Sequence, residues 1–213
     1  MISHLYPDSV VGVANASIAS ETLHSAEASG IRNAVPKRRE EFAAGRACAH
    51  AALRQLGFDD VAVPRASDRS PVWPDGIVGS ISHCDGFCGA VVARQQDVRS
   101  LGLDVESKGR LGRESHDLIC SPREKSALGA ATEACDPVEI LFSAKESFYK
   151  AYYPPTKFYL DFLDVDVTID FSNDSFQATL LRADAPSLFG QRVVPGRFAL
   201  SEDRVFTGVV LES

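Results

Sequence analysis

Two carboxylates two positions apart, Asp104 and Glu106, stand in the apolar stretch LGLDVE at residues 101–106 of this 213-residue chain. On a β-strand both would point to one side, while Leu103 and Val105 would face the core. Carboxylates held together repel each other, and a divalent cation relieves that repulsion. An oxygen-only donor set suits Mg²⁺, which completes its shell with water and substrate phosphate. The pattern predicts a metal site, although an exposed strand edge explains the same hexapeptide.

A third carboxylate lies in the sequence FSAKESFYKA at residues 142–151, where Lys145 precedes Glu146 and Lys150 follows one helical turn later. A Glu–Lys pair at this spacing is usually a surface pair worth a few tenths of a kcal/mol. If the helix packs on the strand of Asp104, however, Glu146 becomes a third metal ligand or a proton acceptor. Both lysines would then lie beside a bound phosphate.

Hydrogen-bond donors suited to a diphosphate occur in the sequence VWPDGIVGSISHC at residues 72–84. Gly79 and Ser80 permit a close approach of the backbone, and Ser82 and His83 offer polar side chains. The alternative is that His83 is a structural residue with an internal hydrogen-bond partner.

A basic cluster precedes these motifs. Arg39 and Arg46 are seven residues apart and share a helical face, with Arg38 and His50 near its margins. Guanidinium groups bind phosphate through paired hydrogen bonds, so the cluster predicts an anion site. A solvated basic helix face is the simpler alternative.

Two internal similarities predict the elements that position these residues. Residues 42–51 resemble residues 142–151, and both read as helices, with Pro154 and Pro155 ending the second. Residues 82–92 resemble residues 201–211 in the same order. We therefore expect a duplicated α/β unit joined near residues 95–105. Strict alternation in residues 164–171 predicts a further strand, whose aspartates form a solvated face.

Composition places the chain among ordinary globular proteins, with 45% hydrophobic and 24% charged residues. Its length corresponds to one large domain or two small ones. Five irregularly spaced cysteines favour reduced thiols in a cytoplasmic protein. A net charge of -7 disfavours nucleic-acid binding, and no apolar run approaches the roughly 18 residues of a membrane span. We expect a monomer without a nucleic-acid or membrane partner.

Together and in this order, four motifs closely resemble the surfactin-type 4′-phosphopantetheinyl transferases, particularly the branch of enterobactin synthase component D. The matching pieces are RREEFAAGRA, VWPDGIVGSISHC, GLDVE and FSAKESFYKA, which span residues 38–151. The resemblance implies an α/β (α+β) fold of two pseudo-twofold-related subdomains with helices packed on antiparallel sheets. Residues 1–100 would bind the coenzyme A nucleotide, and residues 101–213 would hold the metal site and contact the carrier protein.

The resemblance also implies the reaction. The 4′-phosphopantetheine arm of coenzyme A moves to a serine of an apo acyl, peptidyl or aryl carrier protein, and adenosine 3′,5′-bisphosphate is released. Such an enzyme uses Mg²⁺, or Mn²⁺ in its place. Nonribosomal-peptide, polyketide, siderophore and fatty-acid carriers would all fit as acceptors.

By the family's pattern, each motif has an implied role. The metal ligands would be Asp104, Glu106 and Glu146, and the catalytic groups Glu146, Lys150 and His83. The coenzyme A contacts would be Arg38, Arg46, Ser82, His83, Lys145 and Lys150, together with either Arg65 or Arg69. Two rival functions remain: a Mg²⁺-dependent hydrolase of the coenzyme A diphosphate, and a carrier-binding module without turnover.

Overall fold

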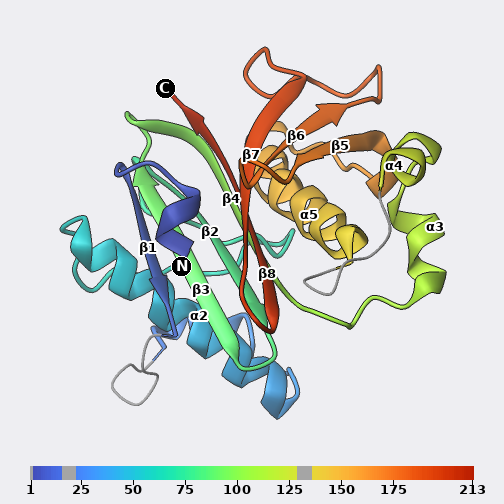
Figure 1. Cartoon of the computed structure of the whole chain (residues 1–213). Helices are drawn as coiled ribbons and strands as arrows, with labels where there is room; N and C mark the ends of the chain where they lie inside the picture. The colour runs from blue at the N-terminus through green and yellow to red at the C-terminus, as the bar shows by residue number, and fades with distance from the viewer. Residues whose placement is uncertain (1, 16–22, 129–135) are drawn as a thin grey trace.

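The computed structural model describes residues 2–15, 23–128 and 136–213 (Figure 1). Its strands are β1 (Val10–Ala14), β2 (Ile77–Cys84), β3 (Phe87–Arg94), β4 (Val98–Ser107), β5 (Val165–Asp170), β6 (Ser175–Leu180), β7 (Val193–Leu200) and β8 (Arg204–Glu212). Its α-helices are α1 (Ser25–Ser29), α2 (Pro36–Gln55), α3 (His116–Ile119), α4 (Pro122–Ala127) and α5 (Pro137–Thr156). Short 3-10 helices cover Ile2–Leu5, Arg113–Ser115 and Phe162–Asp164.

The strands form two antiparallel sheets, which confirms the predicted mixed α/β class. One sheet has three strands in the order β1-β3-β2, and the other has five in the order β4-β8-β7-β6-β5. Figure 1 shows α2 and α5 against different sheets, with β4 and β8 between them. The proposed subdomain boundary at residue 100 falls within β4, so the second sheet already begins at Val98.

Both segments of the predicted repeat form long helices that pack on a sheet. Helix α2 buries Ala49 and Leu53 against Val92 of β3, and α5 buries Phe148 and Tyr152 within the core of the larger sheet. The second similarity also has a structural counterpart. Phe87 on β3 and Phe206 on β8 occupy matching positions of the repeat, and their rings meet edge to face at 5.3 Å.

Helix α5 continues through the two prolines that were predicted to end it. Its last residue is Thr156, and Lys157 adopts the left-handed conformation that ends the helix. A proline at position 155 has no N–H to donate to the carbonyl of Ala151. That carbonyl instead accepts a hydrogen bond from the Ser100 hydroxyl of β4, so the neighbouring strand supplies the missing donor.

The two sheets meet where β2 lies beside β4, and serine hydroxyls make the hydrogen bonds there. Ser80 Oγ accepts from the backbone N–H of Leu103 at 3.0 Å, and Ser82 Oγ accepts from Val105 at 3.2 Å. Buried backbone N–H groups are costly when unpaired. The two hydroxyls therefore satisfy an edge of β4 that would otherwise be unpaired, and they fix β2 against it.

The predicted strand at residues 164–171 forms as β5, but the expectation of a solvated aspartate face is wrong for Asp166. This side chain is only 3% exposed. It accepts a hydrogen bond from the Ser121 hydroxyl at 2.7 Å and pairs with Arg123 at 3.0 Å. Helix α4 supplies Arg123 and is capped by Ser121. The segment after β4 that carries α3 and α4, here called the α3–α4 excursion, therefore covers the strand face that alternation alone would predict to be exposed to solvent.

Two further expectations concern cysteines and membranes. Cys48, Cys84, Cys88 and Cys120 are reduced and not joined in disulfides, and Cys135 lies outside the described residues. Within the described parts of the chain, each helix is too short or too polar to cross a bilayer.

The contact between β4 and α5 predicts a sensitive glycine. A Cβ at Gly102 would overlap the backbone carbonyl of Ser147 on α5, which cannot move without shifting the helix. Gly102→Ala should therefore lower the free energy of unfolding by about 1–3 kcal/mol or more. Gly30→Ala is the matched control, because its Cβ would lie at an ordinary 3.5 Å from the nearest atom. Denaturant unfolding measures both, and equal stabilities would contradict this packing.

Candidate functional site

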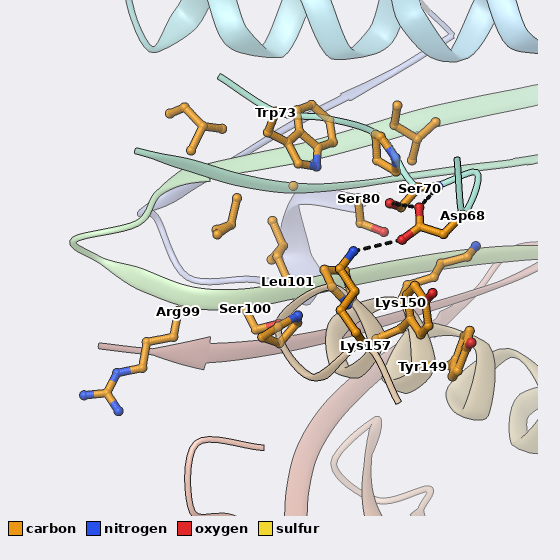
Figure 2. Close-up of a pocket in the computed structure, with 18 of the residues that line it drawn as sticks. Asp68, Ser70, Trp73, Ser80, Arg99, Ser100, Leu101, Tyr149, Lys150 and Lys157 are labelled. Atoms are coloured by element: carbon orange, nitrogen blue, oxygen red, sulfur yellow. Dashed lines mark hydrogen bonds and ion pairs between the residues drawn. The ribbon is translucent and has the colours of Figure 1, made fainter. Parts of the chain in front are cut away.

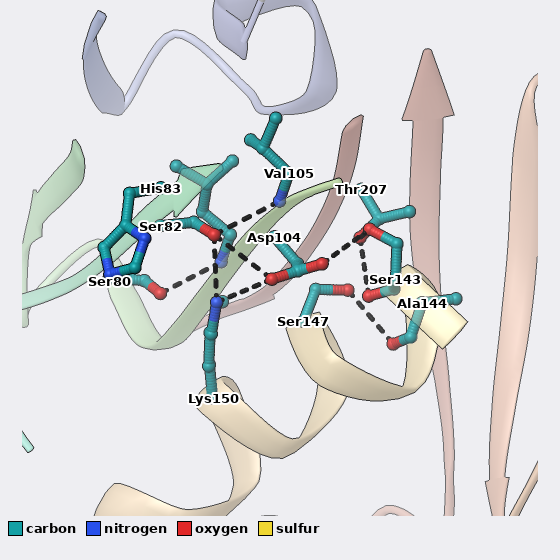
Figure 3. Close-up of polar contacts among 12 residues, drawn as sticks. Ser80, Ser82, His83, Asp104, Val105, Ser143, Ala144, Ser147, Lys150 and Thr207 are labelled. Carbon is teal, nitrogen blue, oxygen red and sulfur yellow. Dashed lines mark hydrogen bonds and ion pairs between the residues drawn. The ribbon is translucent and has the colours of Figure 1, made fainter. Parts of the chain in front are cut away.

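A buried carboxylate lies at the junction of the two sheets and α5. Asp104 on β4 is 2% exposed. Its Oδ1 accepts hydrogen bonds from Lys150 Nζ at 2.7 Å and from Ser82 Oγ at 3.1 Å (Figure 3). Lys150 Nζ also donates to Ser82 Oγ at 3.1 Å. The structure thus brings together three of the predicted site residues, from β4, α5 and β2.

Two hydroxyls that sequence reasoning missed complete this environment. Ser143 of α5 donates to the other oxygen of Asp104 at 2.8 Å, and Thr207 of β8 donates to the Ser143 carbonyl at 2.7 Å. Figure 3 shows both beside Asp104. A sequence signal existed, because Ser143, Ser147 and Lys150 follow one another at helical spacing and so share a face of α5.

Two further carboxyl groups are destabilised in their charged form near Asp104. Burial, together with the charges of Asp104 and Glu146, raises the pKa of Glu106 to about 7. Burial and the Asp104 charge likewise raise the pKa of Glu146 above its usual value, against the opposing effect of Lys150. The three predicted metal ligands therefore share one electrostatic environment, in which negative charge exceeds what Lys150 balances.

The carboxylate oxygens of Asp104, Glu106 and Glu146 suit a hard divalent cation. The Lys150 ammonium, however, already occupies a cation position beside Asp104. Among the described residues, one group of His, Cys, Asp or Glu brings three donor atoms within 4.8 Å of one another, namely His24, Glu27 and His50. Asp104, Glu106 and Glu146 do not converge that closely. The ammonium of Lys150 is the cation bound to Asp104, so a metal ion would compete with it for this carboxylate.

The buried Arg46 of α2 marks a candidate anion site. Arg46 is 5% exposed, and its Nε has no hydrogen-bond partner among the described residues. Its guanidinium lies over the Phe42 ring, 4.2 Å from the centroid. Burial, together with the charges of Arg38 and Arg65 and against the charge of Glu27, lowers the pKa of Arg46 to about 10. A buried guanidinium in this state strongly favours a bound anion.

His83 of β2 contacts Arg38, one of the arginines of the candidate anion site. Its Nε2 lies 2.6 Å from Arg38 Nη1. Because a guanidinium can only donate, Nε2 is the acceptor and the imidazole is neutral in this arrangement. Burial and the Arg38 charge lower the pKa of His83 below its usual value, which agrees with a neutral ring. Ser82, which binds Asp104, is the preceding residue of β2.

The structure separates the two arginines between which the sequence could not choose. Arg65 lies close enough to Arg46 for its charge to act on that guanidinium. Arg69 instead lines the rim of a cavity, with a left-handed backbone at φ 72°. Arg65 is therefore the candidate that lies with Arg46, whereas Arg69 lines the cavity.

Lys145 lies away from the site where the sequence pattern predicted it. It is 3% exposed. Its ammonium donates to the carbonyls of Ile119 and Phe162 at 2.7 and 2.9 Å, and to Glu124 at 2.8 Å. An ammonium has three protons, and all three are used here. Lys145 thus holds the α3–α4 excursion against α5, whereas Lys150 faces Asp104.

A cavity of about 980 Å³ extends from Lys150 between β2 and the end of α5. Tyr149, Tyr153 and Trp73 give it apolar walls, and Ser80 adds a hydroxyl (Figure 2). The Trp73 indole packs where a Cβ on Gly79 would lie, which explains the glycine at that position. Such a cavity can hold a flexible, mostly uncharged chain whose phosphate end lies at Lys150.

An ion pair between Lys157 and Asp68 joins the two walls of this cavity. Lys157 Nζ lies 2.9 Å from an Asp68 carboxylate oxygen, and Figure 2 shows the pair beside Ser70. Lys157 directly follows the last residue of α5, and Asp68 precedes β2. The pair therefore connects the segment before β2 to the end of α5.

The placement of Lys145 predicts a loss of stability on truncation. Lys145→Ala leaves Glu124 buried without its partner, which should cost about 3–5 kcal/mol in the free energy of unfolding. Lys125→Ala is the matched control, because the Lys125–Asp117 pair is exposed and such pairs contribute about 0–1 kcal/mol. Denaturant unfolding compares them. A Lys145→Ala protein of full stability with impaired turnover would instead place this lysine at the reacting phosphate.

Two family models match the chain. A family model described as the 4′-phosphopantetheinyl transferase N-terminal domain matches residues 26–93, and one described as the 4′-phosphopantetheinyl transferase superfamily matches residues 100–201. The first match contains the anion-site arginines and His83, and the second contains the carboxylates and Lys150.

Two relatives with the same description match most of this chain. The chain is 40% identical to the 4′-phosphopantetheinyl transferase Svp of Streptomyces mobaraensis, over 89% of this chain and 78% of the relative. It is 37% identical to PptT of Mycobacterium tuberculosis, over 87% and 84%. Enterobactin synthase component D of Salmonella typhi is 40% identical over 57% of this chain and 51% of its own length. The chain therefore belongs to the 4′-phosphopantetheinyl transferase family.

Proposed function

We propose that this protein transfers the 4′-phosphopantetheine group of coenzyme A to a serine hydroxyl of an apo acyl, peptidyl or aryl carrier protein. One observation carries the proposal. Lys150 contacts the buried Asp104 at the carboxylate cluster and also lines the cavity. A phosphate bound at Lys150 would therefore have the catalytic carboxylates on one side and space for its pantetheine arm on the other.

Coenzyme A has three parts that this site can accommodate. The 3′-phosphate of its ribose suits Arg38, Arg46 and Arg65, where a buried guanidinium lacks a partner for its Nε. The diphosphate suits the neighbouring His83, Ser82 and Lys150. The pantetheine arm suits the cavity with its tyrosine and tryptophan walls.

The reaction exchanges a phosphoanhydride bond of the diphosphate for a phosphoester bond to the serine. The carrier serine oxygen bonds to the β-phosphorus, the bond from that phosphorus to the bridging oxygen breaks, and adenosine 3′,5′-bisphosphate leaves with the bond's electrons. Negative charge grows on the leaving oxygen, which Lys150 is placed to stabilise. The serine proton goes to Glu146, directly or through a water, because a carboxylate beside the reacting serine can act as its general base.

Asp104, Glu106 and Glu146 are the residues that would hold Mg²⁺, or Mn²⁺ in its place. When bound, the ion would neutralise diphosphate charge and polarise the phosphoryl group. The excess of negative charge around these residues supports this role. With the Asp104 charge balanced in this way, Lys150 would have its ammonium available to the phosphate.

The carrier protein would approach from the side of residues 101–213. This part contributes Glu146 and Lys150, and it holds the exposed basic residues of the α3–α4 excursion. Carrier domains of this class are acidic around the modified serine, so Arg110 and Arg113, both exposed, offer charge complementarity. We propose a monomeric cytoplasmic enzyme in which one chain carries the whole site.

Mass spectrometry of an apo-carrier incubated with the protein, coenzyme A and Mg²⁺ tests the activity. The carrier should gain one phosphopantetheine. Glu146→Gln should lower kcat by about 10²- to 10⁴-fold, because it removes the proton acceptor and one carboxylate of the metal site. Glu40→Gln, an exposed substitution on α2, is the control.

Two other results would contradict this function. Coenzyme A cleavage without a heavier carrier would indicate a hydrolase that uses water in place of the serine. Carrier binding with no covalent change across a panel of apo-carriers would indicate a module without turnover.

A further inference from the structure

A fully buried carboxylate outside the reacting centre connects three segments of the first half. Glu27 of α1 is 0% exposed. Its Oε1 accepts hydrogen bonds from His50 Nε2 at 2.8 Å and from the backbone N–H of Val63 at 2.7 Å. Its Oε2 accepts from the backbone N–H of His24 at 3.0 Å. The last bond caps the helix locally, whereas the first two reach distant parts of the chain.

The hydrogen bonds to Glu27 from His50 and Val63 come from positions close in the chain to Arg46 and Arg65, two arginines of the candidate anion site. His50 follows Arg46 by four residues on α2, so both side chains lie on one face of that helix. Val63 precedes Arg65 by two residues in an extended segment, and it is itself fully buried. Fixing His50 and Val63 to one carboxylate therefore fixes the backbone positions from which Arg46 and Arg65 extend.

The charge of Glu27 has a use beyond these hydrogen bonds. Burial opposes its ionisation, but the hydrogen bonds from His50 and from the backbone of Val63 outweigh this effect and lower its pKa below the usual value. Glu27 is thus an anion close enough to Arg46 for its charge to act on that guanidinium. Its charge offsets the mutual repulsion of Arg46, Arg38 and Arg65. Without that anion, holding three cations around one site costs more.

We propose that Glu27 is a positioning residue for recognition of the 3′-phosphate: through His50 and Val63 it holds Arg46 and Arg65 together, and its negative charge offsets the repulsion between them. This inference rests on the proposed function, because it assumes that these arginines bind the 3′-phosphate of coenzyme A. Glu27 itself touches neither the substrate nor the reacting atoms.

A binding experiment on the full chain tests it without turnover. Isothermal titration calorimetry gives the Kd of adenosine 3′,5′-bisphosphate, which carries the 3′-phosphate, and that of AMP, which lacks it. Glu27→Gln keeps the shape of the side chain and removes its charge. It should weaken bisphosphate binding by about tenfold, the effect of a charged hydrogen bond worth about 1.5 kcal/mol, and leave the Kd of AMP unchanged.

Glu124→Gln is the matched control for a purely structural effect. Glu124 is also a buried carboxylate in a helix-capping box, at 2% exposure, and it accepts from the backbone N–H of Val167 at 2.6 Å. It pairs with Lys145 in the other half of the molecule, far along the chain from the arginines. It should lower stability and leave the ratio of the two Kd values unchanged.

Further variants separate this inference from the function on which it rests. Arg46→Ala should abolish the preference for the bisphosphate, and a retained preference would show that the arginines are not the phosphate site. If Arg46→Ala loses the preference but Glu27→Gln keeps it, the positioning role is wrong while the proposed function stands.

Should Glu27→Gln fail to fold, His50→Phe carries the test. It keeps a ring against His24, which packs edge to face at 5.1 Å, and removes the donor that connects α2 to Glu27. It should weaken the bisphosphate selectively. Equal weakening of both ligands would show that the network only supports the fold, which would overturn the inference.

Discussion

A carboxylate buried at a junction of sheets and helix requires a cation and several hydrogen-bond donors, and Asp104 determines which residues surround it. Ser82 of β2 and Ser143 and Lys150 of α5 must approach from two different elements to satisfy its two oxygens. The same contacts fix β2 and α5 against β4. Structure and chemistry therefore depend on one group, since the elements that stabilise Asp104 also supply the side chains that would meet a phosphate.

The site has two electrostatic ends of opposite sign. Arginines with a buried, unpartnered Nε form one end, and carboxyl groups with raised pKa values form the other. Neither arrangement is favourable without a ligand, because each holds like charges together in a partly buried place. A substrate with separate phosphates and a divalent cation would relieve both. This complementarity explains why the protein tolerates such charges, and it agrees with the family to which the chain belongs.

Residue periodicity predicted the elements well because burial imposes it directly. The apolar stripe of α5 and the alternation around Asp104 follow from packing against a sheet, and both are visible in a single sequence. The two lysines of α5 show where such reasoning stops. Lys145 and Lys150 are five residues apart, or roughly 140° around a helix, so they cannot both face one phosphate. The motif alone does not say which one does, because that depends on how the helix is rotated against β4.

Hydrogen-bond partners that lie far apart in the chain could not be predicted from the sequence, for a related reason. Ser143, Thr207 and Glu27 become important only through contacts with residues far away in the chain. Pro155 of α5 is a similar case. The Ser100 hydroxyl of β4 donates to the Ala151 carbonyl, which the proline leaves unpaired. Such partners follow from tertiary structure and leave little local pattern, apart from the spacing of Ser143, Ser147 and Lys150.

The most direct test of this account is a crystal structure of the protein with coenzyme A and Mg²⁺. The account predicts that the ion binds Asp104, that the Lys150 ammonium has moved from that carboxylate to the diphosphate, and that the 3′-phosphate contacts Arg46. An ion held elsewhere, with Lys150 still paired to Asp104 in the complex, would contradict it.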